Sequence, residues 1–328
     1  MIRIYHPTNR NNNRIKEIDF LRGFLILLMV MDHLFFDFGQ LIYIISNFSM
    51  DQSLLSQFVM FSSSYLNWDF RINFRIFVVM LFFFISGISF QFSKNNNKRG
   101  VILLIIGILL TLGSIIVSYI LKDDFVIIAS IFLTFGLAIL ITNFIYFVIN
   151  KILKNNTISA LFLVIIGLLG AIYFIHFTFN VNVPIINKIE SFNDLIDVIL
   201  GYKQYGFDDI PLLINLTAML IGFGIGKLVY PNRKSLFSYF NKKIYVKPSK
   251  SLKFYNQKLF VRKKAIYILL TPFSLIGKLI EFFGRHSLYV YIIHQFVLIP
   301  ILIICLISNG FNLALWLKKK QVYMKIYY

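Results

Sequence analysis

The chain has 328 residues, of which 58% are hydrophobic and 14% are charged. Several uncharged runs reach the length of about 20 residues that a helix needs to cross a bilayer. This composition excludes an ordinary soluble domain and predicts an all-α, polytopic transmembrane helix bundle. The formal net charge of +19 does not indicate nucleic-acid binding, because the basic residues stand between the apolar runs, as membrane topology requires.

The first apolar run, residues 17–45, contains charged groups that are costly inside a bilayer and are therefore candidates for function. Arg22 and His33 are eleven positions apart, which places them on one helix face, separated by roughly 16 Å along the axis. Asp37 follows His33 by one helical turn on the same face. The alternative is that these groups only pair with neighbouring helices.

The next elements in chain order are a polar, aromatic outer loop (46–71) and four membrane-crossing helices. We predict these helices at about 72–92, 101–121, 126–149 and 158–179. The small residues Ser86, Gly87 and Ser89 would allow close approach of another backbone. Lys98 and Arg99 mark the cytoplasmic side.

An acidic outer loop (180–209) and a further helix (210–229) lead to residues 231–264, which contain eleven Lys or Arg and no acid. This segment is interpreted as a basic cytoplasmic loop, with attraction to anionic lipid as the alternative. The run 265–277 is too short to span and is read as interfacial, and the last clear span covers 282–308. This gives seven spans, although an eighth would place Lys318, Lys319 and Lys320 on the cytoplasmic side.

The domain organisation follows from this placement. We expect a cytoplasmic basic tail over 1–16, one transmembrane domain over 17–308 and a C-terminal tail over 309–328. The protein is expected in the plasma membrane with its N-terminus in the cytoplasm, in contact with membrane lipid. The sequence does not indicate an oligomeric state.

Candidate chemistry lies inside the membrane, because the chain has no phosphate-binding loop, no GxSxG motif and no zinc-type His and Cys spacing. No metal or nucleic-acid partner is therefore predicted. Ser287, Tyr291 and His294 share one face of the last span. If that span runs outward, His294 lies at a depth similar to that of His33, and the two imidazoles would share a cavity. The alternative is a buried hydrogen-bonding pair that holds two helices together.

Four segments occur in the order found in a known family: IDFLRGFLILLMVMDH, FFFISGISFQFSKNNNKRG, YGFDDIPLLINLTAMLIGFGIGK and GRHSLYVYIIHQF. Over roughly residues 14–300 the chain resembles bacterial membrane proteins related to the catalytic domain of heparan-α-glucosaminide N-acetyltransferase. The Arg22-x10-His33 spacing also resembles the Arg-x10-His pattern of the wider transmembrane acyltransferase superfamily.

The resemblance implies transfer of an acyl group, usually acetyl, from cytoplasmic acyl-CoA to a sugar amine or hydroxyl of an envelope glycan or glycolipid. His33 would be the base or the nucleophile, with Asp37 orienting its ring and His294 nearby. Arg22, Lys98 and Arg99 would bind the CoA phosphates, and the segment from Ser86 to Ser89 would admit the pantetheine arm. Two other functions stay open: a proton-coupled transporter or flippase that uses the intramembrane His and Asp residues, and a scaffold with structural polar pairs.

Overall fold

The structure is a computed structural model that describes residues 15–45, 53–93, 95–121, 126–180, 183–186, 188–205, 209–231 and 275–310. The chain divides into two compact units. The first comprises Met1–Leu34 and Asn232–Leu298, and the second comprises Phe35–Pro231 and Ile299–Tyr328. Four predicted segments lie mostly outside the described residues: the basic tail 1–16, the basic loop 231–264, the interfacial run 265–277 and the C-terminal tail 309–328.

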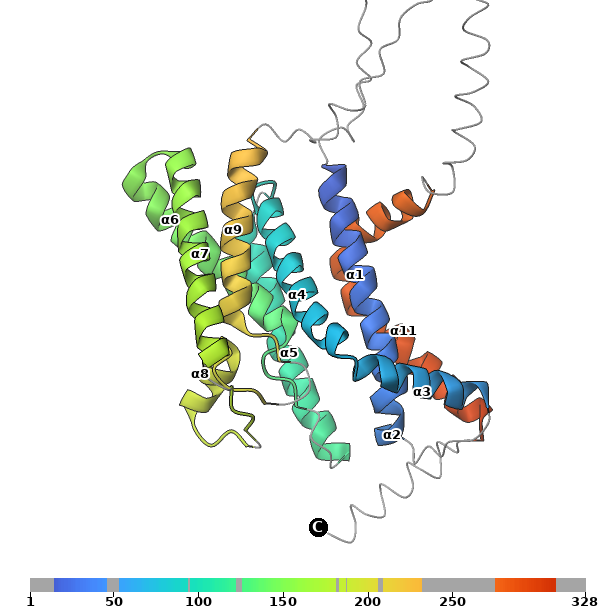
Figure 1. Ribbon diagram of the computed structural model, residues 1–328. Coiled ribbons are helices and arrows are strands. Elements are labelled where there is room, and N and C mark those ends of the chain that lie inside the picture. Colours follow the sequence, from blue (N-terminus) through green and yellow to red (C-terminus); the bar gives the residue numbers. More distant parts are fainter. Residues whose placement is uncertain are drawn as a thin grey trace, which may run out of the picture. The chain divides into compact units, whose positions relative to one another are not determined.

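The first unit is built from α1 (Lys16–Phe36) as far as Leu34, a helix over residues 275–285, and α11 (Ser287–Ser308) as far as Leu298. Between the helix over 275–285 and α11, only His286 lies outside regular helix. Its N–H donates to the carbonyls of Phe282 and Phe283. The last span was predicted to start at 282, but α11 begins at Ser287, after this turn. Within the unit, α1 and the first part of α11 run side by side in the same direction (Figure 1).

The first apolar run is helical from Lys16 to Ile45, but it is not one regular α-helix as predicted. After α1, residues Asp37–Leu41 form a π-helical turn, η1, and Ile42–Ile45 form α2. A π turn inserts extra backbone into the helix and therefore changes its pitch, and such turns are frequent at functional sites. Asp37, the first residue of the turn, is buried, with 1% of its surface exposed.

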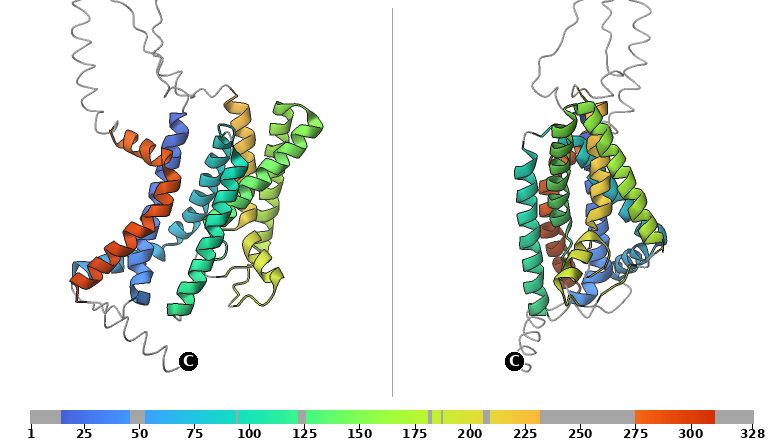
Figure 2. Two further views of the ribbon diagram at one scale, coloured as in Figure 1. Left: turned by 180° about the vertical axis from the view of Figure 1, so that it is seen from behind. Right: turned by 90° about the vertical axis from the view of Figure 1, so that its left-hand side faces the viewer.

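The second unit contains a bundle of long apolar helices: α4 (Asp69–Phe90), α5 (Asn96–Leu121), α6 (Ile131–Leu153), α7 (Asn156–Asn180) and α9 (Leu212–Val229). Helix α9 packs against α4, α6 and α7, and α5 packs against α6 (Figures 1 and 2). Among the described residues, these five helices and α11 are long and apolar enough to cross a membrane. The described part of the chain forms no strand, so the predicted all-α transmembrane bundle is confirmed, and its helices agree with about seven spans when α1 is included.

Glycine residues bring α4 and α9 into backbone contact. A Cβ atom on Gly87 would lie 2.3 Å from the carbonyl oxygen of Met219, and one on Gly222 would lie 2.0 Å from that of Phe84. Neither position could carry a side chain without moving a helix. The prediction that small residues allow close backbone approach in this part of the second helix is therefore confirmed at Gly87.

The predicted outer loop 46–71 is wrong in its second half, because α3 (Leu54–Leu66) lies there and α4 already begins at Asp69. Two of the polar residues of this segment, Ser56 and Ser62, are fully buried on the packed face of α3. The Oγ atom of Ser62 donates to the Phe58 carbonyl four residues back, which satisfies the hydroxyl inside the helix. Serine therefore acts here as a small packing residue.

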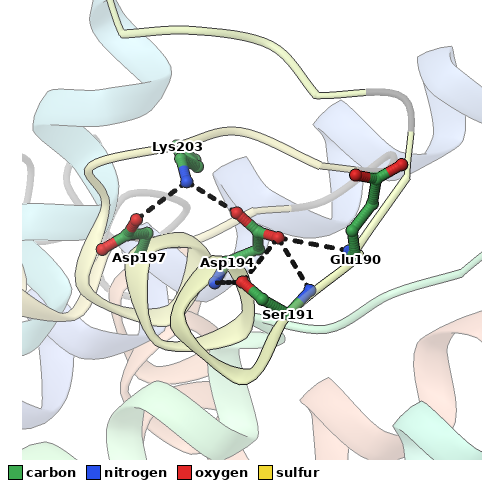
Figure 3. A network of polar contacts seen from close by, with 5 residues as sticks. All are labelled: Glu190, Ser191, Asp194, Asp197 and Lys203. Atoms are coloured by element: carbon green, nitrogen blue, oxygen red, sulfur yellow. Dashed lines mark hydrogen bonds and ion pairs between the residues drawn. The ribbon is translucent and has the colours of Figure 1, made fainter.

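The acidic segment between α7 and α9 contains a short helix, α8 (Phe192–Leu200), with strong caps at both ends. Ser191 and Asp194 form a reciprocal capping box at its start, and Gly201 ends it with a left-handed φ of 100°. Figure 3 shows Lys203 between two carboxylates, 2.7 Å from Asp194 and 3.0 Å from Asp197. The hydrogen bonds from Lys203 and Ser191 hold the pKa of Asp194 well below its ordinary value.

Candidate functional site

The candidate site in the first unit is centred on two histidines from helices far apart in the sequence. The imidazole rings of His33 in α1 and His294 in α11 contact each other edge to face, with centroids 4.8 Å apart and planes at 84°. His294 is buried with 8% of its surface exposed, and His33 is half-buried. The structure therefore brings together the two imidazoles that sequence spacing placed at a similar depth.

Each of these rings is also tied to its own helix. The Nδ1 atom of His33 lies 3.0 Å from the carbonyl oxygen of Met29, and Nδ1 of His294 contacts the carbonyl oxygen of Tyr291. A carbonyl oxygen only accepts hydrogen bonds, so each Nδ1 carries a proton and donates it. In the neutral form of either ring the basic lone pair is consequently on Nε2, which is the nitrogen available for chemistry.

Arg22, also in the first unit, lies about three turns before His33 on α1. Its Nη1 atom is 3.9 Å from Asp19, and the two side chains are 17% and 14% exposed. A guanidinium carries five N–H donors in a planar fork, which is the geometry that carboxylate and phosphate oxygens accept. The cation predicted near one end of the helix is present, and its role toward CoA stays a prediction.

Asp37 belongs to the second unit, where η1 packs against α3. A Cβ atom on Gly39 would lie 2.7 Å from the side chain of Leu66 and 3.0 Å from the backbone of Ser62. The hydroxyl of Ser63 donates to the Gly39 carbonyl at 2.9 Å. These contacts fix the π turn that begins at Asp37, and α3 was the part of this arrangement that sequence analysis missed.

The other predicted cofactor-binding residues are also in the second unit. The Ser89 hydroxyl donates to the carbonyl of Ile85 at 2.8 Å, and Ser86 is half-buried on the same helix. Lys98 and Arg99 are exposed in the first turn of α5, where the Lys98 N–H donates to the side chain of Asn95. Lys98 and Arg99 thus form the basic start of α5. The binding of CoA by these two residues and by the serines stays a prediction.

No group of three or more His, Cys, Asp or Glu side chains within the described ranges could hold a metal ion. The first unit offers two imidazoles in contact, and a guanidinium farther along α1. Such groups suit proton transfer, nucleophilic attack and binding of anionic oxygen.

The sequence profile of a known family matches residues 14–261, which is more than half of the chain. Its description is heparan-alpha-glucosaminide N-acetyltransferase, catalytic. The chain belongs to this family. Searches of curated proteins and of solved structures found no significant match.

Membership of the heparan-alpha-glucosaminide N-acetyltransferase catalytic family agrees with the multi-pass helical fold and points to a membrane acetyltransferase. The matched region includes α1 with Arg22 and His33, and it ends before α11 with His294. The contact between His33 and His294 therefore comes from the structure and not from the family match.

Proposed function

We propose that this protein transfers an acyl group, in the first place acetyl, from cytoplasmic acyl-CoA to a sugar amine or hydroxyl of an envelope glycan or glycolipid. The observation that carries the proposal is the contact of His33 with His294, in which both Nδ1 atoms are bound to backbone carbonyls. This arrangement leaves Nε2 of His33 as the reactive atom in a chain of an acetyltransferase family.

In the first form of the reaction, His33 acts as a base. Its Nε2 takes a proton from the acceptor amine or hydroxyl while the acceptor nitrogen or oxygen attacks the thioester carbonyl carbon. The carbon–sulfur bond then breaks, and the departing CoA thiolate receives the proton from Nε2. The imidazole returns to its starting state, and no other reactant is needed.

In the second form, His33 is the nucleophile. Its Nε2 attacks the thioester carbonyl carbon and the CoA thiolate leaves, so that the acyl group is carried on the ring. The acceptor then attacks the acyl carbon and releases Nε2, and its proton passes to the thiolate or to a base such as His294. Both forms use the same nitrogen, because Nδ1 is held by Met29.

The predicted cofactor-binding residues serve to bind CoA in this proposal. Arg22, Lys98 and Arg99 supply cations for the CoA phosphates, and Ser86 and Ser89 flank the path of the pantetheine arm. Because the Met29 carbonyl already orients the His33 imidazole at Nδ1, the proposal gives Asp37 no hydrogen bond to that ring. The basic residues between the spans support a cytoplasmic N-terminus in the proposed topology, with the protein in the plasma membrane.

A comparison of cells with and without this protein tests the proposal at the level of product. The acetyl and longer acyl content of envelope polysaccharides and glycolipids should fall when the gene is removed and should return with the wild-type chain but not with His33→Ala. Equal acyl content in all strains would contradict the proposed reaction.

A further inference from the structure

The helices of the first unit contact each other closely at two places that have the same spacing in both chain segments. Gly23 of α1 meets Gly284 of the helix over 275–285, and His33 meets His294. In each segment the histidine follows the glycine by ten residues. The two contacts are therefore ten residues apart along each segment, and in the second segment the turn at His286 lies between them.

The glycine contact leaves no room for a side chain on either helix. A Cβ atom on Gly23 would lie 1.8 Å from the carbonyl oxygen of Ile280, and one on Gly284 would lie 1.7 Å from that of Asp19. Both obstructing atoms belong to backbone, so a rotamer change cannot relieve the clash. Since atoms in contact need roughly 3.5 Å, a methyl group would push the helices apart on the order of 1.5 Å.

The histidine contact depends on the separation of the same two segments. Each imidazole is tied by its Nδ1 atom to a carbonyl of its own helix, Met29 for His33 and Tyr291 for His294. A ring held in this way moves with its helix. Only Arg285 and His286 lie between Gly284 and the start of α11, so a displacement at Gly284 should be passed on to His294.

We propose that Gly23 and Gly284 are positioning residues, which set the distance between the two imidazoles for acyl transfer. This inference rests on the proposed function for its catalytic consequence, but not for its geometric one. A displacement of about 1 Å at reacting groups can lower a rate on the order of 100-fold. Gly23→Ala and Gly284→Ala should accordingly lower kcat by about 10-fold to 100-fold, with KM for acetyl-CoA nearly unchanged.

Gly277 provides a matched control on the same helix as Gly284. A Cβ atom on Gly277 would meet nothing within 4 Å. Gly277→Ala adds the same methyl group to the same helix without touching α1, so it should keep the wild-type kcat. Equal loss of kcat in Gly277→Ala and Gly284→Ala would show a general effect on the helix and would overturn the inference.

A cross-linking experiment measures the geometry without using activity. The only cysteine, Cys305, is first replaced by serine, and cysteines are introduced as His33→Cys and His294→Cys. A short bis-thiosulfonate reagent should join them in high yield with glycine at 23 and 284, and with Gly277→Ala. The yield should fall several-fold with Gly284→Ala or Gly23→Ala.

The two readouts separate this inference from the proposed function. Loss of cross-linking in the alanine variants of a protein with no acyl transfer at all would support the positioning contact and refute the reaction. Poor cross-linking in the native glycine background, or an unchanged yield in Gly284→Ala, would overturn the positioning contact whatever the activity. The cross-linking yield in the native glycine background still tests the contact of the two histidines if an alanine variant fails to fold.

Discussion

His33 and His294 contact each other edge to face, at a centroid distance of 4.8 Å, although 260 residues of chain lie between them. Both rings donate from Nδ1 to a backbone carbonyl of their own helix. The pair is thus a rigid arrangement of two bases whose Nε2 atoms are available for chemistry. This contact connects the sequence motif of α1 with that of α11.

Replacement of His33 by alanine should abolish acyl transfer and leave membrane insertion intact, because the proposed reaction uses Nε2 of this ring for the proton transfer or the attack. The loss should be on the order of 100-fold or more, as is typical for a general base. His176→Ala is the matched control, since this exposed histidine of α7 lies in the other unit. Turnover of His33→Ala at the wild-type rate would remove this residue from the mechanism.

Arg22→Ala should weaken the binding of acyl-CoA. A hydrogen bond between a guanidinium and a phosphate contributes about 1.5–3 kcal/mol, so KM for acyl-CoA should rise by roughly 10-fold to 100-fold. Titration of the purified variant with acetyl-CoA, followed by initial rates, measures the change. Arg22→Lys should recover part of the affinity, and an unchanged KM in Arg22→Ala would count against the assigned role.

The fold was predictable from sequence where length and composition decide it, as the close agreement of α4, α7 and α9 with the expected spans shows. Helix α3 was not predictable in this way, because its buried Ser56 and Ser62 resemble loop residues unless their packing partners are known. The π turn at Asp37 likewise depends on contacts between Gly39 and α3, which no helical periodicity indicates.

The candidate site was predictable only in part. Spacing on one helix predicted the relation of Arg22 to His33, and depth suggested a partner in His294. Gly23 and Gly284 were not predicted as helix contacts, although each stands next to an arginine, Arg22 or Arg285, in the sequence. A small residue next to a functional one is informative only when the segment it contacts is known.

Stability of the segment around α8 should depend on pH in a defined direction. The folded pKa of Asp194 is lowered by Lys203 and Ser191, so its stabilising contribution is present above its ordinary pKa of about 3.9 and is lost as pH falls below it. The pKa of Lys203 is raised by Asp194 and Asp197, so its contribution is present below its ordinary pKa of about 10.4 and is lost as pH rises through the folded value.

Hydrogen exchange of α8 amides measures this dependence. Protection should be constant between about pH 5 and pH 9, after correction for intrinsic exchange, and should fall below about pH 4. Lys203→Met should lower protection at neutral pH, whereas Lys188→Met, an exposed lysine of the same loop, should not. Equal protection in Lys203→Met and the wild type would show that the ion pairs do not hold the helix.

Packing of α5 against α6 should be sensitive to a methyl group at Gly136. A Cβ atom there would lie 2.7 Å from the backbone nitrogen of Leu104 and 2.8 Å from the carbonyl oxygen of Gly100. Overpacking of this kind costs about 1–3 kcal/mol, so Gly136→Ala should lower the thermal midpoint of the purified protein. Gly113→Ala, where a Cβ would meet nothing within 4 Å, should leave it unchanged or raise it.

Purified protein in sealed vesicles tests most directly whether His33 mediates acyl transfer from acyl-CoA. Radiolabelled acetyl-CoA is supplied on the side of the basic segments, and amino-sugar or polysaccharide acceptors are supplied on the other. Label should reach the acceptor with the wild type and not with His33→Ala. Absence of acetyl-CoA-dependent labelling of any acceptor, together with proton flux driven by a substrate, would contradict this reaction and favour a transporter.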